Sequence, residues 1–125
     1  MSKHRLSDYL THLHQAASDA SGFVTGMKLD EFLADKRTQQ AVIMNLIIIG
    51  EAATRVMEGY GHFAAKHPEI AWSSMRGMRN RIAHGYFDIS VEVVWQTIQT
   101  AVPELLEQLA ALHPDADTEE RKSVT

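Results

Sequence analysis

The sequence predicts an all-α protein, an antiparallel bundle of four to five helices in one domain over residues 1–113. Apolar residues recur at helical rather than strand spacing along most of the chain. The segments between these runs are short and carry glycine or proline, which is typical of connections in a helical bundle. Residues 114–125 are polar and mixed in charge, so we expect a disordered tail there.

The first helix is predicted over residues 6–20. Its apolar residues follow one another at steps of three or one positions and form one stripe: Leu6, Tyr9, Leu10, Leu13, Ala16, Ala17 and Ala20. Gly22 and Gly26 lie near its expected end, and residues 30–33 are expected to form a short helical turn before the next long helix.

The second long helix is predicted over residues 38–59. Ile47, Ile48 and Ile49 could also form a buried strand, but 22 residues in one register without proline favour a helix. The first half is apolar on nearly all sides, with Val42, Ile43, Met44 and Leu46 beside the three isoleucines. Such a helix is buried on more than one face, so it is expected to be central or to face a second subunit.

The second half of the chain begins with a short stretch over residues 62–66, and Pro68 then interrupts the chain. A modest helix is predicted over 72–83, begun by Ser73 or Ser74 and followed by Gly85. Ser90 is expected to cap a final helix that continues to Leu112. Pro103 should bend that helix rather than end it, because the apolar stripe keeps its register beyond the proline.

Composition excludes several classes of protein. The 125 residues include no Cys, so disulfide frameworks, Cys-based zinc sites and thiol nucleophiles are excluded. The formal charge of −4 argues against a generally basic surface for nucleic acid, but not against a local cationic site. The N-terminal residues show no signal-peptide pattern, and the longest apolar run, 46–49, is far too short to span a bilayer. A cytoplasmic protein without a membrane partner is expected.

Cationic residues gather in one segment. Residues 75–84 contain Arg76, Arg79 and Arg81 beside His84, with no acidic residue. Guanidinium groups donate bidentate hydrogen bonds to phosphate oxygens, and histidine exchanges protons near neutral pH. Arg79 and His84 are five positions apart, about 140° around a regular helix. They can converge if the helix unwinds near Gly85, or if a two-fold axis brings two chains together.

Residues 78–86, MRNRIAHGY, resemble the signature of the HepT-like proteins of the HEPN superfamily: arginine, four residues, histidine, one residue, tyrosine. Four other segments resemble further landmarks of this family: residues 49–53 (IGEAA), 68–72 (PEIAW), 94–95 (VW) and 102–105 (VPEL). The resemblance covers roughly residues 6–112 in the right order.

This resemblance implies a homodimeric toxin of a type VII toxin–antitoxin pair, acting on RNA (mRNA or tRNA) as a metal-independent endoribonuclease without a cofactor. It assigns the catalytic pair to Arg79 and His84. It also implies a partner, a minimal nucleotidyltransferase of the MntA type, that silences the toxin by AMPylation of Tyr86.

The neighbouring polar residues have secondary expected roles. Asn80 and Arg81 are expected to assist substrate binding. Glu51 either pairs with Arg79 and holds it in position or is an exposed helix charge. Taken without the family, His84 is a helix-end histidine that interacts with carbonyl groups. A non-catalytic dimeric module that docks on a nucleotidyltransferase and presents Tyr86 or a nucleotide is the alternative function.

Overall fold

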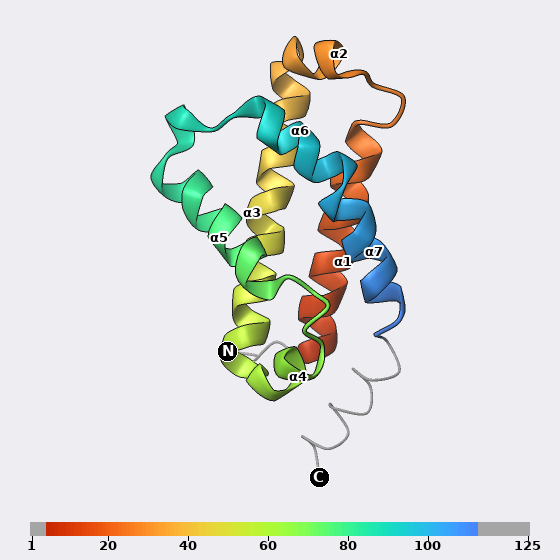
Figure 1. The fold of residues 1–125 in the computed structure, drawn as a ribbon, viewed down its shortest axis with the longest axis vertical. Helices are drawn as coiled ribbons and strands as arrows, with labels where there is room; N and C mark the ends of the chain where they lie inside the picture. Colours follow the sequence, from red (N-terminus) through yellow and green to blue (C-terminus); the bar gives the residue numbers. More distant parts are fainter. Residues whose placement is uncertain (1–4, 113–125) are drawn as a thin grey trace.

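The central helix of the protein, α3 (Lys36–Gly59), packs against α1 (Leu6–Phe23) and against α5 (Trp72–His84) in the computed structural model, which describes residues 5–112. Figure 1 shows α1 and α3 side by side and antiparallel. The remaining elements are α2 (Leu29–Leu33), α4 (Gly61–Lys66), the 3-10 turn η1 (Tyr86–Asp88), α6 (Val91–Gln99) and α7 (Ala101–Ala110). The predicted all-α fold class is confirmed, and the tail over 114–125 lies outside the described residues.

The two predicted long helices form close to their expected positions. In α1 the predicted stripe is buried except for the partly buried Tyr9, and Leu6, Leu13 and Ala17 have no exposed surface. Gly26 follows in the left-handed region with φ 79°, where glycine is favoured. α3 begins two residues earlier than predicted because Asp35 caps it, accepting hydrogen bonds from Thr38 N at 3.0 Å and Thr38 Oγ1 at 2.7 Å.

The apolar first half of α3 is buried on two sides. Val42, Ile43, Leu46 and Ile49 belong to the core, whereas Met44 and Ile48 keep 56% and 39% of their surface exposed. By length and composition α3 could cross a membrane, but 56% of its most apolar window is buried inside the protein. A core helix therefore accounts for its composition, and the exposed pair is an apolar strip that no described residue covers.

The start of α5 differs from the prediction. Neither Ser73 nor Ser74 caps the helix, which starts at Trp72 after Ala71 without a side-chain cap. Trp72 is buried, and its indole Nε1 donates a hydrogen bond to the carbonyl oxygen of His67 at 3.1 Å. This contact fixes the beginning of α5 against the preceding loop.

The prediction of one bent C-terminal helix was wrong. Ser90 does cap α6, with its Oγ accepting from Val93 N at 3.3 Å, but α6 ends at Gln99 and α7 starts at Ala101. Pro103 is the cause, because it has no N–H for the Gln99 carbonyl and its ring collides with the carbonyl four residues earlier. α7 thereby changes direction and packs along α1.

Candidate functional site

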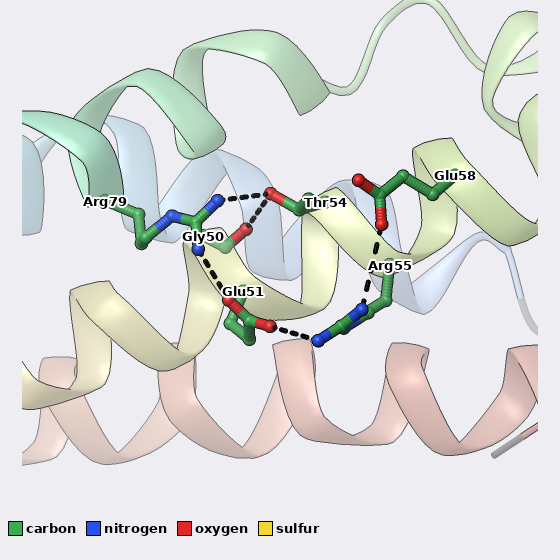
Figure 2. A network of polar contacts seen from close by, with 6 residues as sticks. All are labelled: Gly50, Glu51, Thr54, Arg55, Glu58 and Arg79. Carbon is green, nitrogen blue, oxygen red and sulfur yellow. Dashed lines mark hydrogen bonds and ion pairs between the residues drawn. The ribbon is translucent and has the colours of Figure 1, made fainter. Parts of the chain in front are cut away.

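The guanidinium of Arg79 lies on the side of α5 that faces α3. Its Nη1 donates to Glu51 Oε2 at 2.7 Å, and its Nη2 donates to Thr54 Oγ1 at 3.4 Å (Figure 2). Of the two alternatives for Glu51, the structure shows the ion pair with Arg79. Two contacts from successive turns of α3 therefore fix the plane of the guanidinium.

Gly50 is the reason that α5 can approach α3 so closely here. A Cβ at this position would collide with Arg79 Cβ and would lie 2.7 Å from the carbonyl oxygen of Met75. Only a residue without a side chain fits between the two helix backbones. The glycine thus sets the distance at which Arg79 reaches Glu51 and Thr54.

Glu51 is shared by two arginines. Its second oxygen, Oε1, accepts from Arg55 Nη2 at 3.0 Å, and Arg55 also lies 3.8 Å from Glu58 (Figure 2). Thr54 in turn donates its hydroxyl proton to the Gly50 carbonyl at 2.8 Å, which leaves its oxygen lone pair for Arg79. The carboxylate and the hydroxyl are both held in the orientation that receives the guanidinium.

One donor of Arg79 remains unused. Its Nε is buried and has no hydrogen-bond partner among residues 5–112. The whole side chain nevertheless keeps 26% of its surface exposed. The exposed part of the side chain, and not the buried Nε, is therefore the part of Arg79 that a ligand in solvent can reach.

His84 is the last residue of α5 and is exposed. The helix stays regular to this point, since Gly85 N donates to the Arg81 carbonyl at 2.9 Å. Unwinding before His84 therefore does not bring it round to Arg79 within one chain. His84 instead lines a cleft of about 480 Å³ between the end of α5 and the start of α6.

The other predicted site residues surround this helix end. Asn80 is exposed on α5, and Arg81 is exposed with its Nη2 at 3.8 Å from Met78 Sδ. Tyr86 lies in η1 with 47% of its surface exposed, and its ring meets that of the fully exposed Phe87 edge-on at 6.1 Å between centroids. The tyrosine hydroxyl is thus on an accessible turn directly after the motif helix.

The sequence did not reveal Thr54, Arg55 or the packing role of Gly50. A glycine inside a 24-residue helix was the available signal, because it costs helix stability unless another backbone comes close. Among the described residues, no group of three or more histidine and carboxylate side chains is placed to hold a metal ion.

Comparison with known proteins places this chain in a family. The family described as Ribonuclease HepT-like matches residues 13–112. The chain is 39% identical over 98 residues to "Probable ribonuclease HepT" of Thermococcus cleftensis, covering 78% of this chain and 86% of that protein. It is 32% identical over 124 residues to "Putative RNase MJ0127" of Methanocaldococcus jannaschii, covering 99% and 100%.

No solved structure gives a significant match. The family match nevertheless spans α3, α5 and the motif over residues 78–86, which are the elements that build the site. This chain therefore belongs to the HepT-like ribonuclease family.

Proposed function

We propose that the protein is a metal-independent endoribonuclease in which Arg79 binds the scissile phosphate and His84 transfers protons. The observation that carries this proposal is the state of Arg79: its guanidinium is fixed by Glu51 and Thr54, yet 26% of its side-chain surface remains exposed. An exposed histidine ends the same helix. Together these are the groups that an RNA phosphate requires.

The chemistry uses the ribose of the substrate. A base removes the proton from the 2′-hydroxyl, O2′ attacks phosphorus, and the bond from phosphorus to O5′ breaks while an acid protonates O5′. The products are a 2′,3′-cyclic phosphate and a 5′-hydroxyl. Negative charge grows on the non-bridging oxygens, and Arg79 stabilises it through a preorganised donor. His84 serves as base or acid because an imidazole ring can both accept and donate a proton.

A homodimer completes the site. Within one chain, the regular α5 directs Arg79 towards α3 and places His84 at the cleft beside α6. A two-fold axis near α5 would bring two such helices around one groove and supply both an acid and a base histidine. The exposed strip of Met44 and Ile48 on α3 supplies apolar surface for such a contact.

The position of Tyr86 supports regulation through this residue. The ring is half exposed, two residues after His84. Transfer of AMP to its hydroxyl would add bulk and negative charge where an RNA phosphate must approach, and so block binding by steric overlap and repulsion. We therefore propose a cytoplasmic toxin whose cognate antitoxin is an MntA-like nucleotidyltransferase.

Purified protein incubated with RNA in EDTA tests the nuclease proposal. Wild type should cleave, whereas Arg79→Ala and His84→Ala should lose at least about a hundredfold in rate. Arg76→Ala is the matched control, because it removes the same charge from the same helix outside the motif. Cleavage that survives both motif substitutions would overturn the assignment.

The same variants test the second candidate, a non-catalytic dimeric module that docks on a nucleotidyltransferase. The half-exposed Tyr86 on η1 favours this candidate, because it can be presented to a partner without unfolding. No cleavage of any RNA by wild type, together with intact binding and modification by the cognate nucleotidyltransferase, would support the module over the enzyme.

A further inference from the structure

The cleft beside His84 has the size and lining of a ligand site. It is an open cleft with a volume of about 480 Å³, within the range of roughly 300–1,000 Å³ typical of small-molecule pockets. Its walls are mainly apolar, with Met78 and Ile82 from α5 and Val93 from α6. These apolar side chains suit the flat face of an aromatic ring.

Two opposite charges line the same cleft without neutralising each other. Arg81 and Asp88 are both lining residues and both exposed, and neither forms an ion pair within residues 5–112. The described contact of the Arg81 guanidinium is the weak one to Met78 Sδ at 3.8 Å. The Arg81 guanidinium and the Asp88 carboxylate can therefore form hydrogen bonds with the edges of a ring that carries both donors and acceptors, while the ring face lies on the apolar side chains.

We propose that this cleft binds a guanine base of the RNA next to the bond that is cleaved. Guanine is the RNA base that offers two adjacent donors, N1–H and N2–H, which match the two oxygens of the Asp88 carboxylate. Its O6 and N7 are acceptors that an arginine binds bidentately, and Arg81 supplies that fork. Adenine and cytosine would each place a ring-nitrogen lone pair against the carboxylate.

The position of His84 links this base site to the chemistry. His84 lines the cleft together with Arg81 and Asp88, so a base seated there brings its own ribose or phosphate to the imidazole. This inference rests on the proposed nuclease function and adds a base preference to it. It predicts that cleavage occurs on one fixed side of a guanosine.

Nucleotide binding tests the site without requiring cleavage. ¹⁵N-labelled protein in EDTA is titrated with the 3′-monophosphates of guanosine, adenosine, cytidine and uridine. We expect the guanosine nucleotide to bind about tenfold more tightly than the other three and to shift the amide signals of residues 81–94. Asp88→Asn should remove most of this preference. Glu107→Gln, which removes one exposed carboxylate from α7, should retain it.

Sites of cleavage in a random-sequence RNA give the second readout. Wild type should cut beside guanosine, inosine at that position should slow cutting because it lacks the N2 donor, and Asp88→Asn should be insensitive to inosine. Equal binding of the four nucleotides, or a preference that Asp88→Asn leaves intact, would overturn the base site. Guanosine nucleotide binding without any RNA cleavage would support the base site and refute the proposed function, whereas cleavage without base preference would refute the base site alone.

Discussion

Gly50→Ala perturbs the site through packing alone, without removing a polar group. The added methyl would collide with Arg79 Cβ, and it would lie 2.7 Å from Met75 O and 3.0 Å from Arg79 Cγ. Ordinary carbon contacts are about 3.5–4.0 Å, so the two helices would have to separate by roughly 1 Å. Arg79 would then be drawn away from Glu51, which it now contacts at 2.7 Å.

Two effects of opposite sign determine the change in stability. Replacing glycine by alanine inside a helix contributes about 0.5–1 kcal/mol of stability. Overpacking at a tight helix contact costs about 1–3 kcal/mol. We therefore expect Gly50→Ala to lower the free energy of unfolding, by up to about 2.5 kcal/mol. A misplacement of about 1 Å at a catalytic group can cost on the order of a hundredfold in rate.

Gly77→Ala is the matched control. Gly77 lies inside α5, and a Cβ there would meet no atom within 4 Å. This variant should equal or exceed wild type in stability. Urea unfolding at fixed protein concentration measures the free energy, and RNA cleavage in EDTA measures the rate. If Gly50→Ala matched Gly77→Ala in both assays, the close approach of α5 to α3 would not be what positions Arg79.

Three further substitutions test other parts of the structure. Glu51→Gln should lower the kcat of cleavage about tenfold, equivalent to roughly 1.4 kcal/mol, with little change in KM, because the carboxylate acts through Arg79. The control is Glu58→Gln, whose carboxylate contacts Arg55 but not Arg79, and its kcat should stay near wild type. Equal losses of kcat in the two variants would contradict this role of Glu51. Asp35→Ala should destabilise the protein at pH 7. Hydrogen bonds from Thr38 hold the pKa of Asp35 below its ordinary value of 3.8, so the carboxylate stabilises the protein above that pH, and this stabilisation is lost as the pH falls through the folded-state pKa. In urea unfolding between pH 7 and pH 3, the difference in free energy of unfolding between wild type and Asp35→Ala should therefore shrink. A difference that grew as the pH fell would contradict this reasoning. Ile48→Glu, at an exposed apolar position on α3, should reduce the mass in light scattering from twice the chain mass of 14.0 kDa to that of one chain; a wild type that is already monomeric would refute the dimer.

Local patterns in the sequence predicted most of the helices, because each pattern lies within one helix. The stripe from Leu6 to Ala20 and the cap at Ser90 both form as expected. The break at Thr100 was missed because the apolar stripe continues across it, and periodicity does not register the hydrogen bond that Pro103 removes from Gln99.

The site was predictable only in part, since it depends on how separate helices meet. The motif predicted Arg79, His84 and Tyr86 as candidate site residues, and the pairing of Arg79 with Glu51 was one of two open alternatives. The close approach at Gly50 needed the packing of α5 on α3. The cleft that holds Asp88 needed the angle between α5 and α6, which no spacing in the sequence encodes.

The ends of the RNA products test the proposed chemistry most directly. Wild-type protein is incubated in EDTA with a defined RNA, and each fragment end is identified by mass spectrometry. We expect a 2′,3′-cyclic phosphate on one side of the cut and a 5′-hydroxyl on the other, and no cut where the scissile nucleotide carries 2′-deoxyribose. Ends that carry a 3′-hydroxyl and a 5′-phosphate, or cleavage that stops in EDTA, would contradict a site in which Arg79 and His84 act on the ribose hydroxyl of the substrate.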